Sequence, residues 1–368
     1  MNIGVVCHPT YGGSGVIATE LGLQMAEKGH NVHFITFEKP VRITSYTKNV
    51  FLHEIDIPNY PVFKYPPVSL AISAKIAEVC RNENIEIVHV HYALPYSISA
   101  YIAREMLDKK FKIITTLHGT DISVVGQDSA FLETVQFGIN NSDMVTCVSN
   151  YLKQVTINEF SINKEIHVIP NFINHNIFTP EMKNDCPFLN MNEERTIMHL
   201  SNFRHYKNVE TVVKIFSEIN KTVKSRLILI GEGPVLNNVR KTAKELNVLD
   251  KVIFLGHQTY VEAILPYADL FIFPSIEESF GVALLEAMSC GICFVASNSG
   301  GIPELAGPDL KSLLFNYDDI KGMAQKGIEI LSNQNYCKKL SSLSRKRVIE
   351  NFNMEVIVDK YIELYNMD

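Results

Sequence analysis

The sequence has no excess of basic charge. Its 368 residues include 34 Lys and Arg against 40 Asp and Glu, which gives a formal net charge of −6 at pH 7. Proteins that hold a nucleic-acid backbone or an anionic membrane surface need a cationic field. We therefore expect neither nucleic acid nor a membrane among the partners of this protein.

Long apolar runs are also missing. No stretch of 18 apolar residues occurs, and the N-terminal stretch MNIGVVCHPTYGG has no basic leader ahead of a long apolar segment. Spanning helices and secretory signals need such segments. We expect a cytoplasmic protein.

Cysteine is sparse and shows no disulfide pattern. The cysteines are odd in number and lie mostly in apolar segments, as reduced core thiols do. Cys290 and Cys293 have C-x-x-C spacing, but no second pair accompanies them, so a structural role is favoured over a redox or zinc site. The seven positions are Cys7, Cys80, Cys147, Cys186, Cys290, Cys293 and Cys337.

Length and periodicity predict an α/β protein with two domains. The chain exceeds one ordinary core, and apolar runs alternate with helical segments over residues 1–170 and again over 195–350. Such alternation indicates doubly wound parallel sheets, which are Rossmann-like. Residues 171–194 are expected to form an interdomain linker, and residues 351–368 a helix that packs back across the domain junction. The predicted strands are NIGVVCH, NVHFITF, IEIVHVHY, FKIITTLHG, MVTCVS and EIHVIPN, then TIMHLSNF, SRLILIGEG, KVIFLGH, LFIFPS and CFVASNSG.

A glycine-rich turn follows the first predicted strand. In open parallel sheets, ligands bind beyond the carboxyl ends of the strands. Gly12, Gly13 and Gly15 of PTYGGSG precede a helix, where backbone amides can approach an anion. Their spacing is not the dinucleotide fingerprint, and no acidic residue closes the next strand, so a nicotinamide cofactor is not predicted. A plain tight turn is the alternative.

Histidines follow the middle strands of the first domain. The two-residue period of VHVHY places His89 and His91 on one face. No third ligand with suitable spacing follows, so packing or hydrogen bonding is favoured over a metal site. Tyr92, at the strand end, is a candidate ligand contact. His118 lies just past the strand of TTLHGTD, where an imidazole can meet a substrate hydroxyl and titrate near neutrality, unless its role is structural.

The second domain begins with cationic and amide groups at a strand end. Asn202, Arg204 and Lys207 in SNFRHYKN are placed to hold phosphates, with a solvated loop as the alternative.

The stretch ESFGVALLEAM predicts a second anion site. Ser279, Phe280 and Gly281 lie at a turn before a helix whose first amides are donors that suit a diphosphate. Glu278 precedes this helix, and Glu286 interrupts its apolar run without a Lys or Arg close in sequence. A buried unpaired carboxylate is costly. We therefore expect sugar hydroxyls to be the partner of Glu286.

At these residues the chain resembles glycosyltransferase family 4. The stretch from Glu278 to Glu286 reproduces the signature E-x-F-G-x(4)-E, and PTYGGSG, IPNFINHNIFTP, LIGEGP, FLGH and SGGIPE follow the family's order over nearly the whole chain. The resemblance implies a retaining hexosyltransferase with a GT-B fold, in which two Rossmann-like domains face a central cleft. The N-terminal domain would bind the acceptor, and the C-terminal domain the nucleotide sugar.

A narrower set of motifs resembles one branch of that family. The motifs are PTYGGSGVIATELG, YPPVSLAISAKIAEV, HVHYALPYSISAY, TTLHGTDISVVG, FGINNSD and SNFRHYKN. Members of this branch transfer N-acetylglucosamine from UDP-GlcNAc to the hydroxyl of L-malate, at the start of bacillithiol biosynthesis. UDP-GlcNAc and L-malate are thus the expected substrates.

The resemblance assigns roles to individual residues. Glu286 would hold the uridine ribose and Glu278 the hydroxyls of the donor sugar, while Lys207 and Arg204 would balance the departing charge. The implied catalytic residues are His118, Arg204, Lys207 and Glu278. The implied donor-binding residues are Gly12, Gly13, Gly15, Ser279, Phe280, Gly281, Val282 and Glu286. The candidate acceptor-binding residues are Ser14, Tyr92, Thr116, Asn202 and Arg204.

Two positions depart from the wider family. Asn202 replaces the Arg of a G-R-L-x-x-x-K pattern, and Arg204 lies two residues later, an arrangement associated with malate as acceptor. Glu277 stands where close relatives are expected to carry Lys. The sequence shows no Asp-x-Asp motif, so no metal and no other cofactor is expected. Other possibilities stay open: a family 4 transferase that uses another UDP-sugar or a lipid or glycan acceptor, and a non-catalytic protein that binds a nucleotide sugar. A homodimer is also possible.

Overall fold

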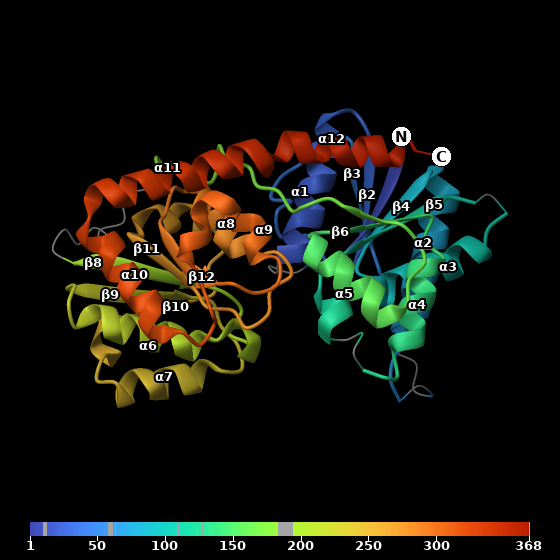
Figure 1. Cartoon of the computed structure of the whole chain (residues 1–368). Coiled ribbons are helices and arrows are strands. Elements are labelled where there is room, and N and C mark those ends of the chain that lie inside the picture. The colour runs from blue at the N-terminus through green and yellow to red at the C-terminus, as the bar shows by residue number, and fades with distance from the viewer. Residues whose placement is uncertain are drawn as a thin grey trace. The chain divides into compact units, whose positions relative to one another are not determined.

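The computed structural model describes residues 1–9, 13–57, 62, 64–108, 110–124, 126, 128–182 and 194–367 (Figure 1). The chain forms two compact units. Unit 1 comprises Met1–Asn171 and Glu355–Asp368, and unit 2 comprises Phe172–Met354. The chain therefore passes into unit 2 after Asn171 and returns to unit 1 after Met354. Two of the residues singled out above, Gly12 and Cys186, lie outside the described residues.

Unit 1 contains a seven-stranded parallel sheet in the order β3-β2-β1-β4-β5-β6-β7. The order reverses direction between β1 and β4, so the chain segments that leave these two strands diverge from one sheet edge, which is where α/β folds bind ligands. The strands are β1 (Asn2–Val6), β2 (Asn31–Thr36), β3 (Val50–Glu54), β4 (Ile87–His91), β5 (Lys112–Leu117), β6 (Met144–Cys147) and β7 (Ile166–Val168).

The described residues of this unit include six α-helices. A kinked turn, Ala93–Ser97, with a cis Leu94–Pro95 peptide bond, leads from β4 into the third of them. The helices are α1 (Gly13–Glu27), α2 (Val68–Glu83), α3 (Ile98–Glu105), α4 (Leu132–Asn140), α5 (Asn150–Phe160) and α12 (Met354–Tyr365), which starts at the last residue of unit 2.

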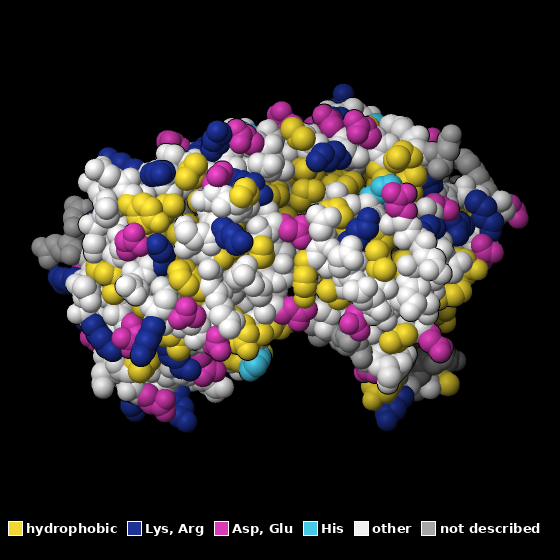
Figure 2. All heavy atoms as spheres, in the orientation of Figure 1, with side chains coloured by type: hydrophobic (Ala, Val, Ile, Leu, Met, Phe, Trp, Pro, Cys, Tyr) yellow, Lys and Arg dark blue, Asp and Glu magenta, His cyan; other side chains and the backbone are white. Residues whose placement is uncertain are grey.

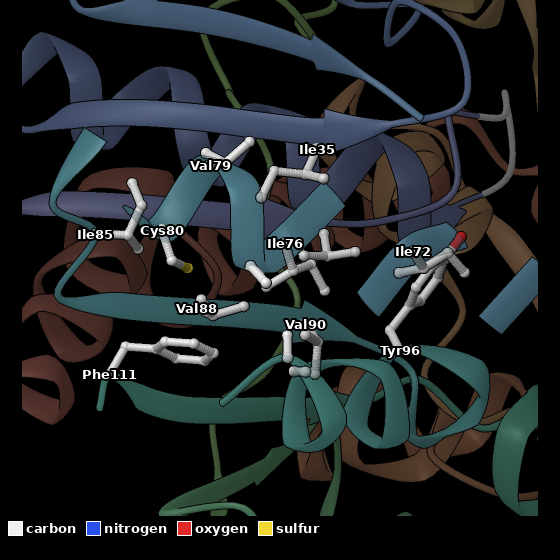
Figure 3. Packing of buried hydrophobic residues seen from close by; sticks show 14 of the residues in the cluster. Ile35, Ile72, Ile76, Val79, Cys80, Ile85, Val88, Val90, Tyr96 and Phe111 are labelled. Carbon is white, nitrogen blue, oxygen red and sulfur yellow. The ribbon is translucent and has the colours of Figure 1, made fainter. Parts of the chain in front are cut away.

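The core of unit 1 packs apolar side chains of α2 against the central strands (Figure 3). Ile72 and Ile76 lie one helical turn apart on α2 and are fully buried, together with Val88 and Val90 of β4. The helical period of α2 and the continuous apolar run of β4 produce this contact.

Unit 2 repeats the plan with six parallel strands in the order β10-β9-β8-β11-β12-β13. Its order reverses between β8 and β11. The strands are β8 (Arg195–Leu200), β9 (Ser225–Ile230), β10 (Val252–Gly256), β11 (Leu270–Phe273), β12 (Phe294–Ser297) and β13 (Leu314–Phe315). The helices are α6 (Val209–Asn220), α7 (Leu236–Glu245), α8 (Val282–Ser289), α9 (Ile302–Ala306), α10 (Ile320–Ser332) and α11 (Gln334–Asn351).

The prediction of two α/β domains with parallel sheets is confirmed. The sequence did not reveal β3, an edge strand with Phe51 and Leu52 exposed, or the two-residue β13. Both lie at the margin of a sheet, where one-sided burial or short length leaves a weak pattern.

The described part of the predicted linker is packed. Phe172, Ile173 and Phe178 are buried, and the amide of Ile173 donates to the carbonyl of Phe352, 3.1 Å away. Residues 183–193 of the predicted linker lie outside the described part of the chain.

The surface carries both signs of charge. On the face seen in Figure 2, Lys and Arg side chains are interspersed with Asp and Glu on each unit. Within the described residues, none of the helices is both long and apolar enough to cross a membrane.

Replacing Ile76 with alanine tests the α2 contact. Ile76 is fully buried, so Ile76→Ala should lower the free energy of unfolding by about 2–5 kcal/mol, from lost burial and the cavity left behind. Leu70→Ala, on the same helix but 59% exposed, serves as the control and should change it by less than about 0.5 kcal/mol. Urea unfolding measures both, and equal effects would contradict the assigned packing.

Candidate active site

The turn between β11 and α8 forms a backbone donor site in unit 2. As predicted, the helix begins directly after Gly281, at Val282. Gly281 has φ 99°, a left-handed conformation that a side chain would strain. The first amides of a helix have no partner within it and lie at its positive end, so this turn can bind an anion.

An ion pair joins this turn to the loop after β8. Lys207 Nζ lies 2.5 Å from Glu278 Oε2, and their side chains are only 15% and 13% exposed. Lys207 Nζ also lies 5.3 Å from the centre of the Tyr206 ring. A backbone hydrogen bond holds the two loops together, because the amide of Ile276 donates to the carbonyl of Tyr206 at 2.8 Å. Two of the four predicted catalytic residues thus contact each other.

Glycines allow the loop after β12 to support Glu278. The amide of Gly301 donates to the carbonyl of Glu278 at 2.8 Å. Gly300 has φ 58°, and a Cβ added there would lie 1.9 Å from the same carbonyl oxygen. The SGG stretch is therefore required in this position by close backbone approach.

A second glycine pair supports the loop after β8. A Cβ at Gly231 would lie 1.9 Å from the carbonyl oxygen of Ser201, and one at Gly233 would lie 2.6 Å from that of Phe203. A side chain at either glycine would therefore clash with the backbone of this loop. Asn202 and Arg204, in the same loop, have exposed side chains available to a ligand.

The expectation that Glu286 lacks a protein partner is wrong. Glu286 is half-buried in α8 and interacts with other groups of the protein, among them Cys290, whose pKa its charge helps to raise. Phe280 is 3% exposed, and its ring lies 5.6 Å from that of Phe352 and nearly perpendicular to it. Its side chain is therefore enclosed, and only its backbone can contact the nucleotide sugar.

In unit 1, the reversed strand order brings Ser14 and Tyr92 together. Ser14 Oγ, in the first turn of α1, lies 2.6 Å from the Tyr92 hydroxyl, which follows β4. Tyr92 has φ 92°, an unfavourable conformation for a bulky residue. Such strain is found where a side chain is held for function. Gly13 and Gly15 flank Ser14 at the start of α1.

His118 lies beside Tyr92, but the expected titration near neutrality is wrong. The ring centres of Tyr92 and His118 are 5.3 Å apart. His118 Nε2 lies 2.9 Å from Nδ1 of His91, whose Nε2 has no hydrogen-bond partner among the described residues. Burial lowers the pKa of His118 to about 3, so the imidazole is neutral at physiological pH.

Thr116 lies in the interior. It is 1% exposed, and its hydroxyl lies 2.6 Å from both His89 Nε2 and Thr146 Oγ1. His89 Nδ1 lies 2.6 Å from the Tyr365 hydroxyl of α12. Hydrogen bonding of His89 is confirmed, and the shared face of His89 and His91 is seen in their ring separation of 4.3 Å. A contact between Thr116 and the acceptor stays a prediction that its burial disfavours.

Asp121 is a positioning residue that the sequence reasoning missed. Its carboxylate accepts from the amides of Ala93 at 2.9 Å, Gly119 at 3.0 Å and His118 at 3.3 Å. It therefore joins the loops that carry Tyr92 and His118. Burial raises its pKa to about 6, against these hydrogen bonds. All three amides precede Asp121, and that of Ala93 is 28 positions away, so no local turn pattern in the sequence marks this residue.

Comparisons with known proteins identify relatives over the whole chain. The family model described as Glycosyltransferase Family 4 matches residues 11–177, and the model for Glycosyl transferases group 1 matches residues 184–347. The chain is 40% identical to the N-acetyl-alpha-D-glucosaminyl L-malate synthase of Bacillus anthracis, over 99% of this chain and 96% of that protein.

Solved structures share the fold. A glycosyltransferase from Rickettsia africae matches with a TM-score of 0.81 and 23% identity, over 99% of this chain and 97% of the other. Anabaena HepE, solved with UDP and glucose, matches with a TM-score of 0.82 and 16% identity, over 100% of both chains.

Two α/β units with parallel sheets, matched along their length by solved structures of this kind, define the GT-B fold, and the family models place the chain among the glycosyltransferases. The family models and the full-length relative narrow the assignment further. The chain belongs to glycosyltransferase family 4, which confirms the resemblance seen in the sequence.

Substituting Gly300 tests the support of Glu278. Gly300→Ala should lower kcat/KM for sugar transfer by about tenfold or more, because the added Cβ displaces the backbone of Glu278. Gly29→Ala is the matched control, since φ there is also positive, at 91°, but nothing lies within 4 Å of the added Cβ. Circular dichroism checks folding. A loss of equal size in both variants would contradict the argument.

The buried histidines predict acid sensitivity. The pKa of His89 is lowered by burial to about 3, while the unfolded chain binds that proton near pH 6.5. Stability present above pH 6.5 is therefore lost as pH falls, by about 1.4 kcal/mol per pH unit for this residue. Urea unfolding should give a lower free energy of unfolding at about pH 5 than at about pH 7. His89→Gln should reduce this difference by about 2 kcal/mol. His205→Gln, at an exposed position, should leave the difference unchanged.

Proposed function

We propose that the protein transfers N-acetylglucosamine from UDP-GlcNAc to the hydroxyl of L-malate with retention of the α configuration. The observation that carries the proposal is the 40% identity to a malate synthase over almost the full length of both chains. The two signature glutamates and the SNFRHYKN loop, with Asn202 and Arg204 exposed, support it.

On the donor side, the proposal uses the loops of unit 2. The amides at the start of α8 bind the diphosphate, and Lys207, which is paired with Glu278, and Arg204, in the loop after β8, supply the cations. Lys207 is already held by Glu278 and by the ring of Tyr206. Such preorganised charges stabilise a leaving phosphate without reorganisation cost at the moment of reaction. Glu278 then receives hydroxyls of the sugar, and Glu286 those of the ribose.

On the acceptor side, a dicarboxylate needs cationic and hydroxyl donors. Arg204 offers a planar fork that matches a carboxylate, and Asn202 adds an amide. Ser14 and Tyr92 offer a pair of hydroxyls that already share a hydrogen bond and can redirect it to a ligand. His118 beside them is neutral and can accept or donate a hydrogen bond without adding charge.

Retention follows if the acceptor attacks from the face that the UDP leaves. The departing diphosphate then takes the proton of the malate hydroxyl, so no protein nucleophile is needed. Metal independence is part of the proposal, as are a cytoplasmic location and a possible homodimer. The nearest alternative is a family 4 transferase with another UDP-sugar or with a lipid or glycan acceptor. A non-catalytic sugar-nucleotide-binding protein is the alternative of another class.

Incubation with UDP-GlcNAc, with and without L-malate and in the presence of EDTA, tests the proposal. We expect UDP release that depends on malate, together with the mass of a GlcNAc-malate product. Lys207→Ala should lower kcat by about 100-fold or more, since it removes charge stabilisation of the leaving group. Lys221→Ala, a control whose side chain is 65% exposed, should be unaffected.

The possible outcomes separate the alternatives. UDP release that is equal without malate contradicts malate as the acceptor, and binding of UDP-GlcNAc without turnover under any condition supports the non-catalytic alternative. Activity that is lost with EDTA and restored by a divalent cation contradicts metal independence alone.

A further inference from the structure

Two thiols of unit 2 lie in contact. Cys293 immediately precedes β12, and Cys337 lies in the first turn of α11. Their sulfur atoms are 3.0 Å apart, and Cys293 Sγ also lies 3.1 Å from the carbonyl oxygen of Cys337. Both are free thiols. The C-x-x-C pair read from the sequence is therefore not the thiol pair that the fold brings together.

The two thiols differ in access. Cys293 is 1% exposed, whereas Cys337 is only half-buried. The hydrogen bond between the two sulfur atoms lowers the pKa of Cys337, and the charge of Arg195 also lowers it, against burial and the charge of Asp269. The same hydrogen bond and burial raise the pKa of Cys293. A half-buried thiol of lowered pKa beside a fully buried thiol is the arrangement of an attacking and a resolving cysteine.

We propose that Cys337 and Cys293 form a reversible oxidation site that takes a hydroperoxide as its oxidant. The Cys337 thiolate attacks the terminal peroxide oxygen, the O–O bond breaks, and the leaving oxygen takes a proton. Cys337 becomes a sulfenic acid. The sulfur of Cys293 then displaces the sulfenic hydroxyl, which leaves as water with the proton of the Cys293 thiol. With hydrogen peroxide, two thiols lose two electrons and two protons, and two water molecules form.

The geometry favours a disulfide over further oxidation. Closing the sulfur separation from 3.0 Å to the bonded length of about 2.05 Å requires a movement of about 1 Å. The pair would then protect Cys337, because a sulfenic acid without a resolving thiol proceeds to the irreversible sulfinic acid. Two thiols of an added reductant restore both cysteines by exchange.

The disulfide would join α11 to the strand that precedes the Gly300–Gly301 turn. Ser297, at the end of β12, donates to the carbonyl of Ser275 at 2.6 Å, and Gly301 donates to that of Glu278. The bond would therefore fix the start of this strand. Because the required movement is small, we expect the oxidised protein to keep its transferase activity within about twofold and to unfold at a higher temperature.

Peroxide treatment of the full chain with a Cys186→Ser background tests the proposal. This background removes the thiol that lies outside the described residues. After mild hydrogen peroxide, peptide mass analysis should find Cys293 linked to Cys337, with a loss of about 2 Da that dithiothreitol reverses. In Cys293→Ser, Cys337 should instead gain about 32 Da as a sulfinic acid that dithiothreitol does not reverse.

Cys290→Ser is the matched control, since Cys290 is also a buried thiol of unit 2 but takes no part in the proposed disulfide. It should behave as the background does. In the unoxidised background, iodoacetamide should label Cys337 at least about tenfold faster than Cys290. This rate does not depend on the folding of any variant.

The absence of a dithiothreitol-reversible link between Cys293 and Cys337, or equal labelling of Cys337 and Cys290, would overturn the proposal. Both readouts are masses and are independent of sugar transfer, so the oxidation site and the proposed function can fail separately.

Discussion

The parallel order of the strands, and its reversal at one point in each sheet, is the constraint on which the candidate site residues of each unit depend. Between β1 and β4, and again between β8 and β11, consecutive connections leave in opposite directions. The loops that follow these strands therefore diverge and leave a crevice at the carboxyl ends of the strands. Ser14 and Tyr92 occupy the first reversal, and Lys207 and Glu278 the second. Side chains from distant parts of the sequence meet there because parallel strands place their carboxyl ends at the same edge of the sheet.

Each reversal point contains costly features that the surrounding packing must offset. In unit 2, Lys207 and Glu278 are largely withdrawn from water, and burial of an ion pair contributes little net stability. In unit 1, Tyr92 adopts a left-handed backbone conformation, and Asp121 is held as a buried carboxyl by three amides. These features would be removed by selection for stability alone. Their concentration at the strand ends agrees with a site that is preorganised for charge and hydroxyl groups.

Sequence reasoning found the elements and most of the strand-end positions, because periodicity and turn residues are local. It could not pair Lys207 with Glu278, which are 71 positions apart, or place Tyr365 on His89 across 276 positions. Thr116 illustrates the limit. Its position at a strand end was readable, but its enclosure by His89 and Thr146 depends on how neighbouring strands and α12 pack. Local pattern indicates where a residue lies along the chain, and tertiary contact decides what its side chain meets.

The protonation state of His118 bears on how the reaction is catalysed. A general base works best when its pKa lies near the pH of the reaction. With a pKa of about 3, His118 is a weak base and does not carry a stable positive charge at neutral pH. Its ring is also already engaged with His91. In the proposed reaction, the leaving diphosphate therefore removes the proton from the acceptor hydroxyl, because its negative charge rises as the anomeric bond breaks. The neutral imidazole beside Tyr92 is then suited to orient a hydroxyl, a role that its fixed position through Asp121 supports.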